Sequence, residues 1–316
     1  MAGKLTDDRE MSASRLPGLL GFSNYSTPND ELQYSINAID GRERPDIGNE
    51  AMGWGNRLEP VVLAEACKRL GIEGEFQIDK PYTHRSFALQ CSLDGIGYGL
   101  SQTVVTDADK GIYVVGQDSI VLDGPGVLEA KVTRTQPEDV PHLARGPIQL
   151  QGQMLVTGHK WGVVTVLYQG IELRTFVFAP HKETQSAIVK AVMEFEIKLE
   201  TYRATGIIDW YPPQTSKELD RIFSVAIDEV VDLPPNVEEM ARGILENKAA
   251  IRAAEASIDE AEKLIKESLG HASKGRAGNL TVSWPMRNYK AQLERLVSSK
   301  DAYSVRQSNL TIKESF

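Results

Sequence analysis

The sequence has few of the features that mark secreted and membrane proteins. Its 316 residues include only two cysteines, Cys67 and Cys91, and they lack the spacing of a metal site. We interpret both as reduced, buried thiols. No apolar run approaches the length that spans a bilayer, and residues 1–11 contain no apolar signal-peptide core. We therefore expect a cytoplasmic protein.

An excess of positive charge is also missing. The chain has 35 Lys and Arg against 44 Asp and Glu, a net charge of −9. Proteins that coat nucleic acid usually have a basic surface, so this balance argues against that class. It does not exclude an enzyme that acts on nucleic acid, because acidic metal ligands lower the count and a local basic channel is sufficient for binding.

Two short stretches combine acidic and basic residues at strand-like positions. Asp94 ends an alternating apolar run, and Glu129-Ala130-Lys131 lies within a second extended run. Side chains at i and i+2 share one face of a strand, so Glu129 and Lys131 project together and Ala130 turns away. Two carboxylates and an ammonium suit a magnesium site beside a phosphodiester. Such triplets are also common on solvated strand faces, so the pattern needs support from its surroundings.

Five segments that occur in a particular order provide that support. They are Ser12-Ala13-Ser14-Arg15 with Leu19-Leu20-Gly21, then Trp54-Gly55-Asn56-Arg57-Leu58-Glu59-Pro60, Cys91-Ser92-Leu93-Asp94-Gly95, Leu128-Glu129-Ala130-Lys131, and a glutamine-rich helix that ends at Val156-Thr157-Gly158. Together, over about residues 10–200, they resemble the phage-type exonucleases of the YqaJ and lambda exonuclease group, within the PD-(D/E)xK nucleases.

The resemblance implies an α/β fold of the restriction-endonuclease type, with a mixed central sheet flanked by helices and a C-terminal helical, coiled-coil-like extension. It implies a Mg²⁺-dependent deoxyribonuclease, with Mn²⁺ as a substitute, that digests linear duplex DNA from 5′ ends. The product would carry 3′ single strands for recombination by single-strand annealing. A ring-shaped homotrimer, an annealing protein as partner and the cytoplasm of a bacterial host cell, for a protein of phage or prophage origin, are further implications.

The resemblance also implies a role for each residue of the acidic cluster. Asp94, Glu129 and the Ala130 carbonyl would hold the metal, and Glu59 would complete a second metal site. Lys131 would position the attacking water. An alternative for Glu59 is an exposed glutamate in the first turn of a helix, because it directly precedes Pro60, and proline fits a first turn but not a helix interior. The helix around it, predicted over residues 52–70, therefore either begins near Glu59 or is kinked there.

Four polar residues would contact the DNA backbone in the same scheme: Ser14, Arg15 and Ser92 at a terminal 5′-phosphate, and Gln149 at the phosphate or the water. The alternative for Ser14 is a helix cap. Gln149 and Gln153 are four residues apart and share a helix face. Gln149 matches the family's glutamine, whereas Gln151 points elsewhere and is interpreted as structural.

The gap between Asp94 and Glu129 is longer than in compact family members. It contains a predicted hairpin, formed by residues 111–115 and 119–122, and four competing carboxylates, those of Asp107, Asp109, Asp118 and Asp123. Asp94 is preferred because its Cys-Ser-x-Asp-Gly context matches the family, and Gly95 would allow a tight turn at the strand end.

The pattern after Glu129 predicts a compact domain that ends near residue 205. A helix is predicted over residues 148–156, a hairpin over residues 161–168 and 171–178 with Gln169-Gly170 as its turn, and an amphipathic helix over residues 182–205. We predict a nuclease domain over residues 1–205 and a helical extension over residues 206–316.

The extension contains a seven-residue repeat within a helix predicted over residues 237–269. Its members are Ile244, Ile251, Ile258 and Ile265, which is typical of a coiled coil or helical hairpin used for assembly. An amphipathic helix packed on its own domain is the alternative. A further helix is predicted over residues 288–298.

Two rival functions remain open at this point. An endonuclease with the same site differs only in its substrate, and a circular duplex without nicks would separate the two. A DNA-binding or assembly protein with a dormant site is the other, and the complete set of Glu59, Asp94, Glu129 and Lys131 argues against it.

Overall fold

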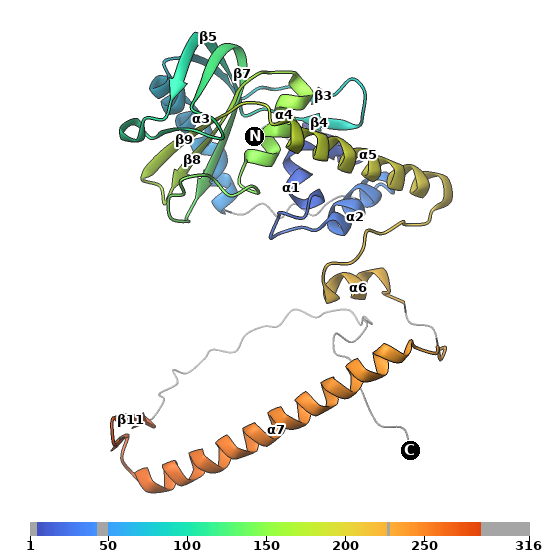
Figure 1. Cartoon of the computed structure of the whole chain (residues 1–316), viewed down its shortest axis with the longest axis vertical. Coiled ribbons are helices and arrows are strands. Elements are labelled where there is room, and N and C mark those ends of the chain that lie inside the picture. The colour runs from blue at the N-terminus through green and yellow to red at the C-terminus, as the bar shows by residue number, and fades with distance from the viewer. Residues whose placement is uncertain (1–4, 43–49, 226–227, 286–316) are drawn as a thin grey trace, which may run out of the picture. The chain divides into compact units, whose positions relative to one another are not determined.

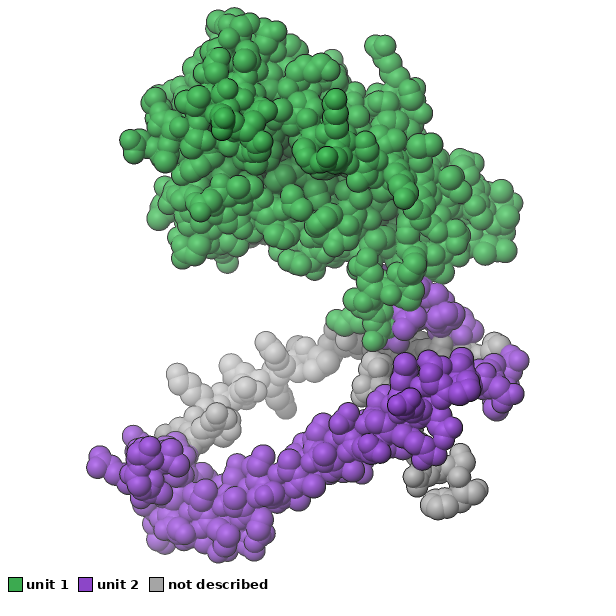
Figure 2. Space-filling view, in the orientation of Figure 1, with its two compact units in different colours: residues 1–218 green, residues 219–316 purple. Residues whose placement is uncertain are grey.

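A computed structural model describes residues 5–42, 50–225 and 228–285 (Figure 1). The chain divides into two compact units, residues 1–218 and residues 219–316 (Figure 2). The division falls later than the predicted one at residues 205 and 206. No described helix is long and apolar enough to cross a membrane.

The first unit is built on a six-stranded sheet with the order β2-β5-β7-β8-β9-β6. Its strands are β2 (Glu73–Phe76), β5 (Gly95–Val105), β6 (Ile112–Val114), β7 (Ser119–Thr133), β8 (Gly162–Tyr168) and β9 (Glu172–Phe178). The β7–β8 and β6–β9 pairs are parallel and the other pairs are antiparallel. The predicted mixed central sheet is therefore confirmed.

The two predicted hairpins have different outcomes. The hairpin of β8 and β9 is confirmed, and its turn residues Gln169 and Gly170 have φ angles of 53° and 75°, as a two-residue turn of this kind requires. The hairpin predicted over residues 111–122 is wrong. The strand β6 pairs with β9, whereas β7 extends from Ser119 through Glu129 and pairs with β5. Turn residues predicted a reversal, but β6 joins the far edge of the sheet beside β9, where Ile112 is buried.

Helices cover both faces of this sheet (Figure 1). The helices of the unit are η1 (Ala13–Arg15), α1 (Leu16–Leu19), α2 (Pro28–Ile39), α3 (Glu50–Leu70), α4 (Pro147–Thr157) and α5 (Lys182–Thr205), and the short η2 (Ala108–Lys110) connects β5 to β6. The predicted helices over residues 148–156 and 182–205 are confirmed. Because α3 continues through Pro60, a helix start near Glu59 is wrong.

Alternate strand residues supply two apolar cores, one on each face of the sheet. Val127 and Val164 belong to the core that contains residues of α1, α2, α4 and α5. Their neighbours Leu128 and Val163 belong to the core that contains residues of α3. Strand periodicity therefore decides which helix each side chain of β7 faces.

A small second sheet joins the start of the chain to the segment that precedes Asp94. It has the order β1-β4-β3, with β1 (Met11–Ser12), β3 (Tyr82–Thr83) and β4 (Leu89–Cys91). The strand β1 is parallel to β4 and pairs Ser12 with Gln90. This register brings η1, which carries Ser14, alongside the chain that leads to Ser92.

The segment after α5 folds back onto the first unit. Asn29 of α2 donates to the Tyr211 carbonyl at 3.1 Å and accepts from the Tyr211 N–H at 2.8 Å. Asn29 also donates to the buried Glu218 at 3.2 Å. These bonds explain why the first unit extends past residue 205.

The second unit contains one long helix. Helix α6 (Ser216–Ile222) spans the division between the units, and α7 (Pro235–Leu269) is followed by the hairpin of β10 (Lys274–Ala277) and β11 (Leu280–Ser283). The predicted helix over residues 237–269 is confirmed, and no residue of α7 is buried. A coiled-coil partner for it stays a prediction. The helix predicted over residues 288–298 lies outside the described residues.

Candidate active site

The structure brings Asp94 to the strand that carries Glu129 and Lys131. Asp94 directly precedes β5, whose first residue, Gly95, pairs with Leu128 of β7. The Asp94 carboxylate accepts a hydrogen bond from the Ala130 N–H at 2.9 Å. The N–H and C=O of a strand residue leave the strand on the same side, so the Ala130 carbonyl faces the edge where Asp94 lies.

Glycine follows Asp94 because two strands approach closely there. A Cβ at Gly95 would lie 2.9 Å from the carbonyl oxygen of Glu75 in the neighbouring strand β2. The φ angle of Gly95 is not positive, so the tight turn predicted at this position is wrong. Glycine is required here for a steric reason, the close approach of β2, and Gly95 places Asp94 directly before β5.

Glu129 and Lys131 project from the same face of β7, the face that α4 covers. Glu129 is 1% exposed, and one of its carboxylate oxygens accepts a bond from the Lys131 ammonium. Lys131 Nζ also lies 3.2 Å from Oε1 of Gln149 on α4. Ala130 turns to the opposite face and packs against the core of α3. The predicted i, i+2 projection is therefore confirmed.

Gln153, one turn after Gln149, was not assigned a role by the sequence. Its side-chain nitrogen donates to Glu129 Oε2 at 2.7 Å and to the Ser92 carbonyl at 3.1 Å. The spacing of four residues placed Gln153 on the same helix face as Gln149, and this spacing was the signal in the sequence that could have identified it. A sequence pattern does not show that Glu129 and the segment before Asp94 lie within reach of the same amide.

Glu59 faces this cluster from α3. The pKa of Glu59 is raised by partial burial and by the charge of Glu129, and Lys131 partly offsets this increase. Asp94, Glu129 and Lys131 make hydrogen bonds within the cluster, whereas Glu59 interacts with it through charge.

Burial and like charge dominate the electrostatics. Burial raises the pKa of Asp94 well above its ordinary value, and the charges of Glu129 and Glu59 raise it further. Burial alone would lower the pKa of Lys131, but the carboxylates of Glu129, Asp94 and Glu59 outweigh it and raise this pKa. One ammonium thus faces three carboxylates, and a further cation would relieve the remaining repulsion.

The donor set fits a hard divalent cation. Among the described residues, no three His, Cys, Asp or Glu side chains are arranged to hold a metal ion by themselves. A site here would need the Ala130 carbonyl and water besides the carboxylates of Asp94 and Glu129. Oxygen-only ligation of this kind, completed by water, is what Mg²⁺ prefers.

The three residues predicted to bind a terminal phosphate have different surroundings. Ser14 and Ser92 are exposed, and the Ser14 hydroxyl lies 3.2 Å from that of Ser12. Ser12 is the residue before η1, and it forms no side-chain cap.

Arg15 is 7% exposed, and its nitrogens bind groups inside the unit. Nε donates to the Glu31 carboxylate at 2.6 Å, and Nη2 donates to the Glu31 carbonyl and to Ser35. The remaining bonds of Nη1 go to the carbonyls of Asp8 and Glu10. Arg15 thus ties η1 to α2, and a direct phosphate contact would require it to release these partners.

Two of the four competing carboxylates of the gap take other partners. Asp107 pairs with Lys110 at 2.8 Å, and Asp123 accepts from Ser101. Neither contact involves the residues around Glu129. Both cysteines are free and buried, as predicted, and burial raises the pKa of the Cys67 thiol to about 11.

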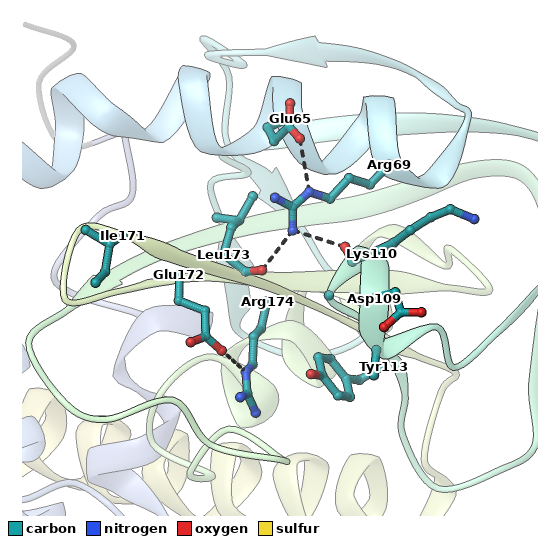
Figure 3. A pocket seen from close by; sticks show the side chains of 11 residues that line it. Glu65, Arg69, Asp109, Lys110, Tyr113, Ile171, Glu172, Leu173 and Arg174 are labelled. Carbon is teal, nitrogen blue, oxygen red and sulfur yellow. Dashed lines mark hydrogen bonds and ion pairs between the residues drawn. The ribbon is translucent and has the colours of Figure 1, made fainter.

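A hollow of about 500 Å³ lies where the end of α3 meets β6 and β9 (Figure 3). Its cations are already paired: Arg69 binds Glu65 at 3.0 Å, and Arg174 binds Glu172 at 2.7 Å. Arg69 also donates to the carbonyls of Lys110 and Leu173. None of the predicted site residues lines this hollow, and Arg69 joins α3 to the edge of the sheet.

The match to a family model agrees with the sequence motifs. Residues 8–160 match the family model of the YqaJ-like viral recombinase domain. The structure of LHK-Exo in complex with dAMP is similar with a TM-score of 0.44 and 16% identity, over 63% of this chain and 94% of that chain. An alkaline exonuclease (LHK-Exo) from Laribacter hongkongensis gives a TM-score of 0.44 and 16% identity, over 62% and 90% of the two chains. No curated protein matches the sequence.

Proposed function

We propose that the chain uses residues 8–160, which match the model of the YqaJ-like viral recombinase domain, as a metal-dependent deoxyribonuclease. The observation that carries this proposal is the convergence of Asp94, Glu129 and Lys131 through the Asp94–Ala130 hydrogen bond and the Lys131–Glu129 ion pair. Burial and the neighbouring carboxylates raise the pKa of Asp94, and a strongly shifted pKa beside a specific charged partner is typical of a functional site. Hydrolysis of a phosphodiester is the chemistry that this donor set suits.

Asp94, Glu129 and the Ala130 carbonyl would hold Mg²⁺ or Mn²⁺, and Glu59 would contribute to a second metal position. A bound Mg²⁺ polarises phosphate oxygens and lowers the pKa of water. The chain's own contribution is to hold the carboxylates in place. The Ala130 N–H partly offsets the raised pKa of Asp94, because its bond stabilises the ionised carboxylate.

Lys131 would orient the attacking water and offset negative charge as the phosphorus–oxygen bond breaks. Gln149 lies 3.2 Å from the Lys131 ammonium and would hold it in place without adding charge. In-line attack by water on the phosphorus would break the P–O3′ bond, leaving a 5′-phosphate on one product and a 3′-hydroxyl on the other, whichever end is digested. The proposed direction, 5′ to 3′, is the one that the family resemblance implies.

Ser14 and Ser92 would contact the terminal 5′-phosphate. Both are exposed, and the pairing of β1 with β4 supports their proximity. Arg15 would act indirectly, because its ion pair with Glu31 positions η1, which carries Ser14. Hydroxyl and backbone N–H groups are ordinary phosphate ligands.

The products would be duplexes with 3′ single-stranded overhangs, substrates for an annealing protein in phage-type recombination in the cytoplasm of a bacterial host. A homo-oligomer, with a ring trimer as the form that the family resemblance implies, would retain the DNA. The extension around α7 would serve assembly or partner contact.

The experiment that tests the proposal compares linear duplex with a covalently closed circle without nicks. We expect Mg²⁺ or Mn²⁺ to support digestion of the linear form only, and Ca²⁺ to permit binding with little cleavage because its coordination is looser. Cleavage of the closed circle would indicate an endonuclease. Full digestion of linear DNA in EDTA, after stringent removal of metal, would contradict the proposed chemistry.

A further inference from the structure

Gln153 is buried in the cluster, with 0% of its surface exposed. Its two side-chain N–H groups have two acceptors, Glu129 Oε2 at 2.7 Å and the Ser92 carbonyl at 3.1 Å. Glu129 belongs to β7, whereas Ser92 belongs to the segment between β4 and Asp94. One amide on α4 therefore bridges the two chain segments that carry the candidate metal ligands.

The orientation of this amide follows from its neighbours. Turning it by 180° would point Oε1 at a carboxylate oxygen and a carbonyl oxygen, which are both acceptors. In the orientation found, Oε1 is buried without a hydrogen-bond partner among the described residues. A buried acceptor without a partner is unfavourable. The favourable contribution of this side chain therefore comes from the two hydrogen bonds that its nitrogen donates.

Glu129 is held from two sides. Lys131 contacts Oε1 and Gln153 contacts Oε2, so rotation of the carboxylate would break one of these contacts. The bond to Ser92 limits movement of the segment that leads to Asp94, two residues later. The Asp94–Ala130 bond then completes a loop of contacts through Ser92, Asp94, Ala130 and Glu129.

We propose that Gln153 is a positioning residue that sets the separation of the Asp94 and Glu129 carboxylates so that both can bind one divalent cation. This inference rests on the proposed metal-dependent function. It assigns Gln153 no contact with substrate or metal. Hydrogen bonds that orient metal ligands typically change metal affinity by about 10- to 100-fold when they are removed.

The test uses Ca²⁺ and the full-length protein, without DNA, and measures the melting temperature across a Ca²⁺ titration. Gln153→Met has similar length and loses both donors. Its midpoint for Ca²⁺ stabilisation should rise by about 10- to 100-fold. Gln153→Asn keeps the amide but shortens the side chain, so its Ca²⁺ midpoint should lie between those of Gln153→Met and the wild type. This variant replaces Gln153→Met in the test if Gln153→Met does not fold.

Gln151→Met is the matched control. Gln151 lies on the same helix and is 5% exposed, but it binds the Ala179 carbonyl at 2.9 Å and accepts from the His181 N–H at 2.8 Å, away from the carboxylates. The Gln151→Met variant should have a lower melting temperature than the wild type without metal and the same Ca²⁺ midpoint. A lower melting temperature with an unchanged midpoint in Gln153→Met and Gln153→Asn would reduce Gln153 to a structural role and overturn the proposal.

Digestion assays separate this inference from the proposed function. Excess Mg²⁺ should restore most of kcat in Gln153→Met, with KM for DNA unchanged. If the wild type binds Ca²⁺ but digests no DNA, the nuclease proposal fails, and a shifted midpoint in Gln153→Met still supports the positioning role. If the wild type shows no Ca²⁺ stabilisation, the positioning role is contradicted, even where digestion proceeds.

Discussion

The backbone N–H of Ala130 donates to the carboxylate of Asp94 at 2.9 Å, across the point where β5 begins beside β7. This bond joins two residues that are 36 positions apart. It also orients the Ala130 carbonyl toward the same edge, because both backbone groups of a strand residue point to one side. The candidate site therefore depends on the start of one strand meeting the middle of another.

Removal of the charge at residue 94 should stabilise the metal-free protein. The pKa of Asp94 is raised by burial, with Glu129 and Glu59 adding to it. The folded state therefore binds a proton more readily than the unfolded state, and this residue's contribution to stability falls as the pH rises from the ordinary pKa of aspartate to the raised one.

Asp94→Asn should accordingly melt at a higher temperature than the wild type at neutral pH in EDTA, by roughly 2–4 °C per kcal/mol of relieved repulsion. It should lose stabilisation by Ca²⁺. At limiting Mg²⁺, wild-type digestion should increase with pH through the raised pKa of Asp94, because the ionised carboxylate binds metal. A melting temperature equal to or below that of the wild type in EDTA would contradict the described electrostatics.

Duplex DNA with 5′-phosphate ends should be degraded faster than duplex with 5′-hydroxyl ends. Exposed hydroxyls at Ser14 and Ser92 are the proposed contacts, so the double variant Ser14→Ala, Ser92→Ala should reduce the ratio of the two rates toward one. Rates come from end-labelled substrates under single-turnover conditions. A wild type without any preference would eliminate the phosphate pocket.

Arg15→Ala gives the contrasting result because Arg15 pairs with Glu31 inside the unit. Loss of one partner of a buried ion pair typically destabilises a protein by about 3–5 kcal/mol. We expect a large decrease in the melting temperature, and any activity that survives should keep its preference for phosphate. If Arg15→Ala is stable and loses the preference, Arg15 contacts the phosphate directly.

The end of the first unit can be tested with two truncations. A chain that ends at Ile222 keeps the bonds of Asn29 to Tyr211 and Glu218, and it also keeps the ion pair of Lys198 with Asp209 at 2.8 Å. A chain that ends at Thr205 lacks all of these and exposes apolar surface. The first should melt near the main transition of the full chain, and the second should melt lower or aggregate. Equal melting temperatures of the two truncated chains would place the end of the first unit at residue 205.

The apolar seam of α7 should contribute to assembly. Ile251 and Ile258 are each 57% exposed and belong to the seven-residue repeat, which in a coiled coil is buried against another surface. The full-length double variant Ile251→Asp, Ile258→Asp should lower the mass measured by light scattering, or lose binding to an annealing protein, and keep its specific nuclease activity. Unchanged mass and unchanged binding would show that the seam packs elsewhere.

Local patterns predicted much of this structure, and non-local pairing accounts for what they did not predict. Periodicity was sufficient for α4, α5 and α7, and strand alternation placed Glu129 and Lys131 on one face. The partner of β6 could not be predicted, because turn residues between β6 and β7 predict a hairpin whether or not the two strands pair. The ion pair of Arg15 with Glu31 and the two bonds of Gln153 join separate segments, and a single sequence carries no signal for such contacts.

The most direct test of the central claim is a time course on linear duplex labelled at both ends, with Mg²⁺ or EDTA. Wild type should release label in Mg²⁺ and be inactive in EDTA. Lys131→Ala and Glu129→Ala should each lower the rate by about 100-fold or more, while the exposed Lys160→Ala should digest like the wild type. Near-normal digestion by a folded Lys131→Ala protein would contradict the assignment of this cluster as the active site.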